Sequence, residues 1–292
     1  MEFTAQSEYH TLDSVFLKPV MQAFIDDFTL SNEWESLNYL AKPDFKMAVK
    51  EYKAFESLLI QLGCKTTNFP KDDKVTIDAI YCRDASIVTD YGVVLCNMGK
   101  AERSLEPKAQ ESMYRKQNIN ILGSIEAPGT LEGGDVAWLN KNTLAVGQTY
   151  RTNAEGIRQL ERLLTPLGIE IIIVNLPHYK GPLDVFHLMS ILSPVDKDLA
   201  VVYSPLMPIR FRNRLLEMGY EFVEVAEEEF ESMGCNVLAV APRKCIMVQG
   251  NPKTEEALRR AGCQVFTYSG NEISIKGGGG PTCLTRPMLR RL

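Results

Sequence analysis

Helical periodicity that ends at a glycine is the first recurring pattern in the sequence. Apolar side chains in residues 47–62 recur at spacings of four and three, at Ala48, Tyr52, Phe55, Leu59 and Leu62. This spacing lines one face of an α-helix. Gly63 follows, and the left-handed conformation that commonly comes after a helix suits glycine. The next segment, CKTTNFP, predicts a short strand that runs into a turn.

The same order of helix, glycine and strand returns along the chain. Gly63, Gly168, Gly219 and Gly262 mark four such units, and Asn118 takes the glycine position in a fifth, weaker one. Successive markers are separated by 55, 50, 51 and 43 residues. A period of about 50 residues is typical of folds built from repeated units. A closed ring of five units follows naturally from this count.

Pairs of short β-rich runs lie between these units: AIYCRDASIVT with YGVVLCNM, GDVAWLN with NTLAVGQT, and NVLAVA with KCIMVQG. Each period is therefore expected to contain two strands, a helix and a third strand, which makes the fold class α/β. No linker or low-complexity segment divides the chain, so we expect one domain over residues 1–292. The alternative is a mixed α/β sandwich, in which the repeat only reflects how common such connections are.

Composition limits the class of protein and its partners. Of the 292 residues, 45% are hydrophobic, which is enough for an ordinary globular core. The formal net charge of −5 gives no electrostatic reason to expect nucleic acid or an anionic membrane as a partner. A small cationic ligand is compatible with this charge.

Cysteine usage and the N-terminal sequence indicate a cytoplasmic location. Seven cysteines are scattered without a CxxC pair, and their odd number leaves at least one unpaired. Reduced thiols fit this usage best. The N-terminal segment MEFTAQSEYHTLDSVFLKPV lacks a basic region followed by a long apolar run, and no stretch of about 18 apolar residues occurs. Secretion and membrane spanning are therefore not expected.

The sharpest local signal is KGGGGPTCLTRP, in which four consecutive glycines precede Cys283. Glycine runs persist where the backbone must approach another group closely or adopt positive φ, as at a ligand pocket. A thiol on such a turn can act as a nucleophile if nearby positive charge or polar donors lower its pKa. An inert core cysteine beside a flexible loop is the alternative explanation.

Three histidines are available as a general acid or base: His10, His178 and His187. His187 lies in the apolar segment GPLDVFHLMSILSP, where partial desolvation would tune its pKa. A core histidine with satisfied hydrogen bonds is the alternative. His178, in a turn after a proline, is the weaker candidate.

Acidic residues mark two further segments. Glu132 and Asp135 flank a Gly-Gly pair before an expected strand, where they could bind a cation, orient a histidine or only form a tight turn. Asp78, Arg83 and Asp84 lie in a β-rich run, where unpaired buried charge is costly. These three either neutralise one another or face a pocket.

Two arginines, Arg103 and Arg151, follow expected strands. Capture of a ligand carboxylate through two hydrogen bonds would be geometrically natural there. Surface arginines are common, however, and a solvated position is the simpler explanation for either residue taken alone.

Taken in order, YCRDASIVTDYGVVLCNMGKAER, LEGGDVAWLNKNTLAVGQTYRTN, FHLMS and GGGGPTCLTRP resemble the guanidino-modifying enzyme superfamily. This superfamily holds arginine deiminases, amidinotransferases and dimethylarginine dimethylaminohydrolases, and the match covers nearly the whole chain. The resemblance implies a pentein fold, a pseudo-symmetric five-bladed α/β propeller of ββαβ units. The active site would lie at the centre of the ring.

The resemblance also implies roles for single residues. Cys283 matches the nucleophile, and His187 matches the general acid and base. Glu132 matches the carboxylate that orients this histidine. Asp84 matches the residue that binds the guanidinium group.

Further positions relate to the branch of the superfamily. Positions matching Asp78, Arg103 and Arg151 hold the amino-acid end of the substrate in the dimethylarginine hydrolase branch. Arg83 replaces the acidic residue usual in that branch and resembles the Arg-Asp pair of deiminases. Met189 in FHLMS stands where deiminases and amidinotransferases place a second carboxylate. An apolar surface there would tolerate N-methyl groups, which favours the dimethylarginine hydrolase branch.

The predicted function is hydrolysis of a C–N bond in a substituted guanidine such as methylated arginine, through a covalent cysteine intermediate that yields a citrulline-type product and an amine. No cofactor or metal is expected, because no histidine or cysteine pair shows ligand spacing. The expected partner is the small guanidino substrate, and a homodimer is left open. An arginine deiminase, an amidinotransferase and a non-catalytic ribosome-associated protein of the same fold are the alternatives.

Overall fold

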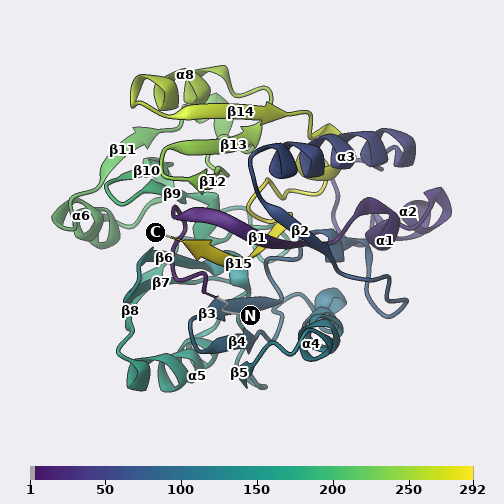
Figure 1. The fold of residues 1–292 in the computed structure, drawn as a ribbon, viewed down its shortest axis with the longest axis horizontal. Helices are drawn as coiled ribbons and strands as arrows, with labels where there is room; N and C mark the ends of the chain where they lie inside the picture. Colours follow the sequence, from purple (N-terminus) through teal and green to yellow (C-terminus); the bar gives the residue numbers. More distant parts are fainter. Residues whose placement is uncertain (1–3, 292) are drawn as a thin grey trace.

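Five three-stranded sheets form the frame of the protein, as a computed structural model describes it for residues 4–291 (Figure 1). The strands, in order across each sheet, are β15 (Thr285–Arg291), β1 (Thr11–Leu17) and β2 (Lys65–Asn68); β3 (Ser86–Thr89), β4 (Gly92–Leu95) and β5 (Ile121–Ser124); β6 (Val136–Asn140), β7 (Thr143–Gln148) and β8 (Glu170–Asn175); β9 (Leu192–Asp196), β10 (Leu199–Val202) and β11 (Glu221–Glu224); β12 (Leu238–Ala241), β13 (Lys244–Val248) and β14 (Gln264–Tyr268).

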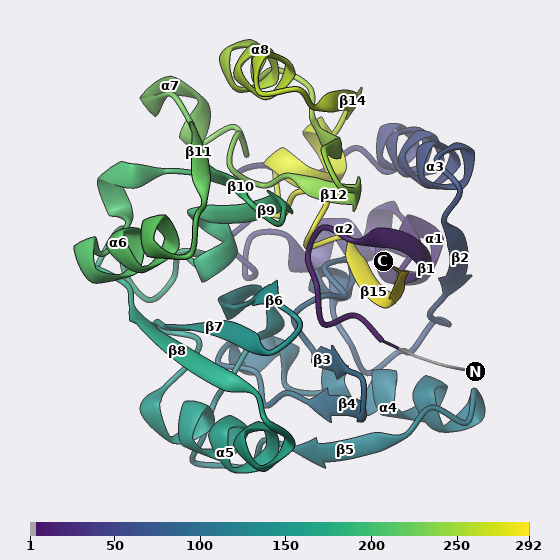
Figure 2. The same ribbon diagram turned by 60° about the vertical axis from the view of Figure 1, so that its left-hand side comes forward.

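Every sheet repeats one topology. Its first two strands are antiparallel, and the third pairs in parallel with the second after a helical connection. The helices of the described chain are α1 (Val20–Ala23), α2 (Asp27–Glu33), α3 (Phe45–Gln61), α4 (Glu106–Lys116), α5 (Ala154–Leu164), α6 (Ile209–Glu217), α7 (Glu227–Phe230) and α8 (Pro252–Arg260). Helices α3, α4, α5, α6 and α8 lie at the periphery of the ring of sheets (Figure 2). The predicted five-bladed α/β propeller is confirmed.

The burial of the strands separates an inside from an outside. We call β3, β6, β9, β12 and β15 the inner strands, because they lie nearest the centre of the ring (Figure 2) and their residues are almost all buried. The third strands, β2, β5, β8, β11 and β14, keep several exposed or half-buried residues. Four clusters of apolar side chains fill the spaces between neighbouring sheets. The ring is thus held by packing around its whole circumference.

The predicted markers between helix and strand all adopt positive φ. The values are 95° at Gly63, 55° at Asn118, 80° at Gly168, 87° at Gly219 and 83° at Gly262. In this region the Cβ of most residues is strained, and glycine and asparagine are tolerated best. The five-fold repeat inferred from these markers is therefore the repeat of the structure.

Some expected strands have different limits. Residues Ile77–Ile80 form a 3₁₀ turn, so the expected run AIYCRDASIVT becomes a strand only at Ser86. Gly133–Asp135 form a similar turn before β6. Both segments carry polar residues that are buried away from a strand ladder, which leaves their side chains free to face the centre of the ring.

Two features of the ring were not predicted. The pair β9 and β10 was not identified, and neither was the antiparallel pairing of β15 with β1, which joins the two ends of the described chain in one sheet. Within residues 4–291, no helix has both the length and the apolar character that crossing a bilayer requires.

Candidate active site

Five side chains of the candidate site precede the five inner strands. Asp84 lies just before β3, Glu132 before the turn into β6, His187 before the turn into β9, Asn236 before β12 and Cys283 before β15. Because every sheet repeats one topology, the beginnings of the inner strands meet at one end of the ring. Each blade therefore contributes one group to the same place.

A buried carboxylate holds the imidazole of His187. His187 Nε2 lies 2.8 Å from Glu132 Oε2. The backbone N–H groups of Gly99 and Lys100 donate to Glu132 Oε1 at 3.0 Å each, and Arg151 Nη1 lies 3.3 Å from the same oxygen. Burial opposes ionisation, but the hydrogen bond and charge of His187, with the charge of Arg151, hold the pKa of Glu132 well below its usual range. Glu132 is therefore an anion that fixes the orientation of the ring.

His187 carries a positive charge at neutral pH. Burial disfavours the charged ring, but the charge of Asp135, the hydrogen bond with Glu132 and the charge of Asp84 raise the pKa of His187 to about 9. Asp135 is fixed nearby, because its Oδ1 accepts a hydrogen bond from the backbone N–H of Leu188 at 3.0 Å. An imidazolium in this position can act as a general acid.

The thiol of Cys283 is buried beneath the glycine run. Asn236 Nδ2 donates to Cys283 Sγ at 3.3 Å. Burial and the charge of Asp84 raise the pKa of the Cys283 thiol, and the hydrogen bond from Asn236 opposes this rise. A Cβ at Gly279 would lie 2.4 Å from the ring of Tyr81 and 3.1 Å from the Cβ of Cys283. Glycine at this position lets the backbone pass between them.

Asp84 offers an unused carboxylate oxygen to the site. Its Oδ2 accepts a hydrogen bond from Arg103 Nη1 at 2.6 Å, whereas the buried Oδ1 has no hydrogen-bond partner within residues 4–291. A Cβ at Gly134 would come within 2.8 Å of Oδ1 and 2.3 Å of His187 Nδ1, so only glycine leaves both atoms accessible. Asp84, His187 and Cys283 line one cavity, whose volume is about 400 Å³ including its open mouth. A ligand in this cavity would face a thiol, an imidazolium and a free carboxylate oxygen.

Asp84, Glu132 and His187 lie close enough together to be considered as ligands of a metal ion. One ligand atom each from Asp84, Glu132 and His187 lies within 4.8 Å of the others. Each carboxylate is already paired with an arginine, Asp84 with Arg103 and Glu132 with Arg151. A divalent cation would meet two guanidinium groups at close range. The set fits a singly charged organic cation better, and the absence of a metal requirement stays a prediction.

The residues expected at the amino-acid end of the substrate line the same cavity, but they are engaged in internal ion pairs. Asp78 Oδ2 pairs with Lys100 Nζ at 2.6 Å. Arg103 pairs with both oxygens of Glu106 at 2.8 Å as well as with Asp84. Bidentate capture of a ligand carboxylate by Arg103 would therefore require one of these pairs to open. Arg151 keeps more of its N–H donors available for a ligand, because its contacts with Glu132 at 3.3 and 3.4 Å involve Nη1 alone.

Arg83 does not belong to the site in the way the Arg-Asp motif suggested. Its Nη2 donates to Glu8 Oε1 at 2.7 Å, and it lines none of the cavities described in this section. Arg83 and Asp84 thus point to different partners and do not neutralise each other. Of the other histidines, His178 Nδ1 lies 2.8 Å from the hydroxyl of the exposed Tyr150, away from Cys283.

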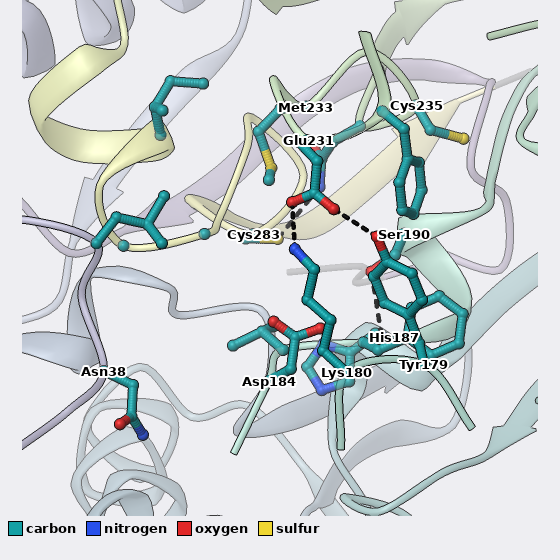
Figure 3. Close-up of a pocket in the computed structure, with 18 of the residues that line it drawn as sticks. Asn38, Tyr179, Lys180, Asp184, His187, Ser190, Glu231, Met233, Cys235 and Cys283 are labelled. Atoms are coloured by element: carbon teal, nitrogen blue, oxygen red, sulfur yellow. Dashed lines mark hydrogen bonds and ion pairs between the residues drawn. The ribbon is translucent and has the colours of Figure 1, made fainter. Parts of the chain in front are cut away.

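A second, wider cavity opens beside the first. Its volume is about 950 Å³ including the open mouth, and His187 and Cys283 line it (Figure 3). Met189 also lines this cavity. Met189 is buried and presents an apolar surface there. Across the cavity, Lys180 and Tyr179 both bind the carboxylate of Glu231, at 2.7 and 2.5 Å. The thiol of Cys283 is therefore reached through a partly apolar space.

Sequence reasoning missed three residues of the site. Asn236, in GCNVLAV, carries no local signal, because only the fold brings its amide to Cys283. Lys100 was overlooked as the partner of Asp78. Glu106 could have been found, since it stands three residues after Arg103, a spacing at which side chains meet on a helical turn.

The ring of five blades and the buried Cys, His, Glu and Asp set at its centre define a guanidino-modifying enzyme with the pentein fold. The chain belongs to the family of N,N dimethylarginine dimethylhydrolases described as eukaryotic, whose model matches residues 26–290.

Individual relatives agree with this assignment. The N(G),N(G)-dimethylarginine dimethylaminohydrolase of Pseudomonas aeruginosa is 27% identical over 248 residues, covering 85% of this chain and 91% of that protein. An arginine deiminase of Listeria welshimeri is 27% identical over 252 residues, but this chain spans only 61% of that enzyme.

Solved structures share the fold. The Pseudomonas aeruginosa dimethylarginine dimethylaminohydrolase, in complex with citrulline, has a TM-score of 0.76 at 23% identity over 96% of this chain and 100% of that one. An amidinotransferase from Microseira wollei has a TM-score of 0.82 at 16% identity, over 100% and 98%.

The charge state of the site predicts how Cys283 reacts with a neutral reagent. Because the pKa of its thiol is raised, alkylation of the free protein by iodoacetamide should be slow at pH 7 and should accelerate only above the ordinary thiol pKa of about 8.5. Added guanidinium ion, placed beside Asp84, should move this rise to lower pH. Mass spectrometry of the Cys283 peptide across pH measures both effects. Fast alkylation at pH 7 without guanidinium would contradict the assigned protonation state.

Proposed function

We propose that this chain hydrolyses methylated arginine, with Cys283 as the nucleophile, His187 as the general acid and base, and Glu132 as the residue that orients the imidazole. The observation that carries the proposal is the shared cavity of Cys283, His187 and Asp84, in which Asp84 Oδ1 is buried and has no hydrogen-bond partner among the described residues. A planar cation would satisfy this oxygen through its N–H groups. Membership of the dimethylarginine dimethylhydrolase family supports the same reaction.

Substrate binding would ionise the nucleophile. The guanidinium cation adds positive charge beside Asp84, which is the carboxylate that disfavours the thiolate in the resting site. The Cys283 thiol gives up its proton to solvent, because His187 is already protonated, and the thiolate then attacks the guanidinium carbon to form a tetrahedral adduct. His187, protonated at neutral pH, donates its proton to the departing amine as the C–N bond breaks.

The second half of the reaction uses the same imidazole as a base. His187 is neutral after the first step and takes a proton from water as the water oxygen attacks the thiouronium carbon. Breakage of the C–S bond returns the thiolate and releases a citrulline-type product. Asp78 and Arg151 are proposed to hold the amino-acid end, with Arg103 positioning Asp84 through their ion pair. A cytoplasmic location and a homodimer stay predictions.

A competition between substrates tests the proposal. Asymmetric dimethylarginine, monomethylarginine, arginine and agmatine are incubated with the protein, and the released amine and the carbon product are identified. We expect dimethylamine and methylamine with citrulline, and slower turnover of arginine, because Met189 presents an apolar surface where a second carboxylate would bind unsubstituted nitrogens. Faster release of ammonia from arginine would contradict this role of Met189 and identify a deiminase.

Two other outcomes separate the remaining alternatives. Transfer of the amidino group to an added amine such as glycine, in preference to water, would identify an amidinotransferase. No turnover of any guanidine, together with no adduct on Cys283 from a reactive amidine, would favour a binding protein of the same fold and would overturn the proposal.

A further inference from the structure

Three arginines gather inside the ring, beneath the candidate active site. Arg83, Arg286 and Arg290, which we call the axial arginine cluster, are only 2%, 4% and 3% exposed. Arg286 and Arg290 belong to the inner strand β15, and Arg83 lies just before the inner strand β3. The proposed reaction uses none of these side chains.

The contacts of the cluster place it on the axis of the ring. Arg286 Nη1 donates to the carbonyl of Ser86 in β3 at 2.6 Å, and Arg290 Nη1 donates to the carbonyl of Ala239 in β12 at 2.9 Å. Arg83 Nη2 donates to Glu8, whose carboxylate also accepts the backbone N–H of Trp138 in β6. Four of the five inner strands thus take part in the cluster or border it.

The charges of the cluster do not balance within residues 4–291. The cluster holds three guanidinium groups, but only that of Arg83 forms an ion pair with a carboxylate of the described chain, Glu8 at 2.7 Å. Burial and mutual repulsion lower the pKa of Arg286 and of Arg290 to about 10, so both still carry a charge at neutral pH. Unpaired buried charge is costly, and proteins rarely keep it.

The buried hydrogen-bond donors of the cluster also outnumber the acceptors that they contact. Five buried guanidinium nitrogens lack an acceptor within residues 4–291: Arg83 Nε and Nη1, Arg286 Nε, and Arg290 Nε and Nη2. Buried donors of this kind almost always have a partner in native proteins. Their number on one axis points to an acceptor with negative charge that several guanidinium groups can share.

We propose that the axial arginine cluster binds a small inorganic anion such as chloride. The three arginines line neither of the two cavities described above, so this anion is distinct from the substrate. The site is completed only when β15 pairs with β1, since two of its arginines belong to β15. The cluster is also joined to the backbone of the proposed nucleophile, because the N–H of Arg83 donates to the carbonyl of Cys283 at 3.2 Å.

Bromide is the direct probe of this site. The wild-type chain is unfolded in denaturant, refolded in sodium bromide and crystallised, and anomalous differences are measured at the bromine edge. We expect an anomalous peak within hydrogen-bonding distance of Arg83, Arg286 and Arg290. Density for water alone, without anomalous signal at the cluster, would overturn the proposal.

Thermal unfolding provides an independent readout. At constant ionic strength, replacing gluconate by chloride should raise the melting temperature by about 2–4 °C for each tenfold increase in chloride above the dissociation constant. Arg290→Met should lose most of this dependence, while Arg260→Met, an exposed position on α8, should keep it. An equal dependence in wild type and both variants would contradict a specific site. The bromide map decides the question if Arg290→Met does not fold.

Discussion

Cys283→Ser should lower turnover of methylated arginine by a factor on the order of 10³ or more while the protein stays folded. A serine hydroxyl is far less acidic than a thiol, and the neighbouring Asp84 disfavours its ionisation further. The change removes little apolar volume, because it replaces one sulfur atom by oxygen in a side chain that lines the cavity. Turnover is measured by citrulline formation, and folding by thermal unfolding.

A second cysteine provides the matched control. Cys263 is also buried but lines none of the described cavities, so Cys263→Ser should keep wild-type turnover. Normal activity in Cys283→Ser would refute the assigned nucleophile. Equal loss in both variants would indicate a general effect of the substitution on the fold.

His187→Asn should lower turnover by about 10²- to 10⁴-fold and trap the covalent intermediate. Without the imidazole, neither the departing amine nor the attacking water has its proton-transfer partner. An activated substrate with a good leaving group should still form the thiouronium adduct on Cys283, so intact-protein mass spectrometry should detect it. His178→Asn is the control, because His178 hydrogen-bonds to Tyr150 outside the site.

The pH profile gives a second test of the same residue. The pKa of His187 is raised to about 9, so the imidazolium acid is present below that pH and is lost above it. The wild-type rate should therefore fall as pH rises through about 9, and the thiol of Cys283 should limit the rate on the acid side. A rate that keeps rising beyond pH 10 would show that His187 is not the acid.

The ring was predictable because its signal is local. Each of the markers Gly63, Asn118, Gly168, Gly219 and Gly262 must adopt positive φ after a helix, and this requirement depends on neighbouring residues alone. The pair β9 and β10 gave no comparable signal, since both strands are short and β9 contains Ser193, Pro194 and Asp196, which are not typical of a strand. The pairing of β15 with β1 joins distant segments, so no local pattern could indicate it.

The candidate site was predictable only where residue type is rare or marked by glycine. Cys283 follows a glycine run, and His187 is one of three histidines. Asp84 and Glu132 were candidates from the two acidic segments, and the resemblance added their particular roles. The direction of Arg83 could not be predicted, because the backbone before β3 is irregular and turns this side chain toward Glu8. The hydrogen bond from Asn236 to Cys283 joins two blades and depends on ring closure.

Each functional group lies at the start of a different inner strand. Catalysis therefore depends on how the blades are placed relative to one another. A slight parting of any two neighbouring blades would separate the thiol from the imidazole or from the carboxylate that receives the substrate, while helices and strands stayed intact. Turnover should therefore be lost at a lower denaturant concentration than the one at which the far-UV circular dichroism signal changes.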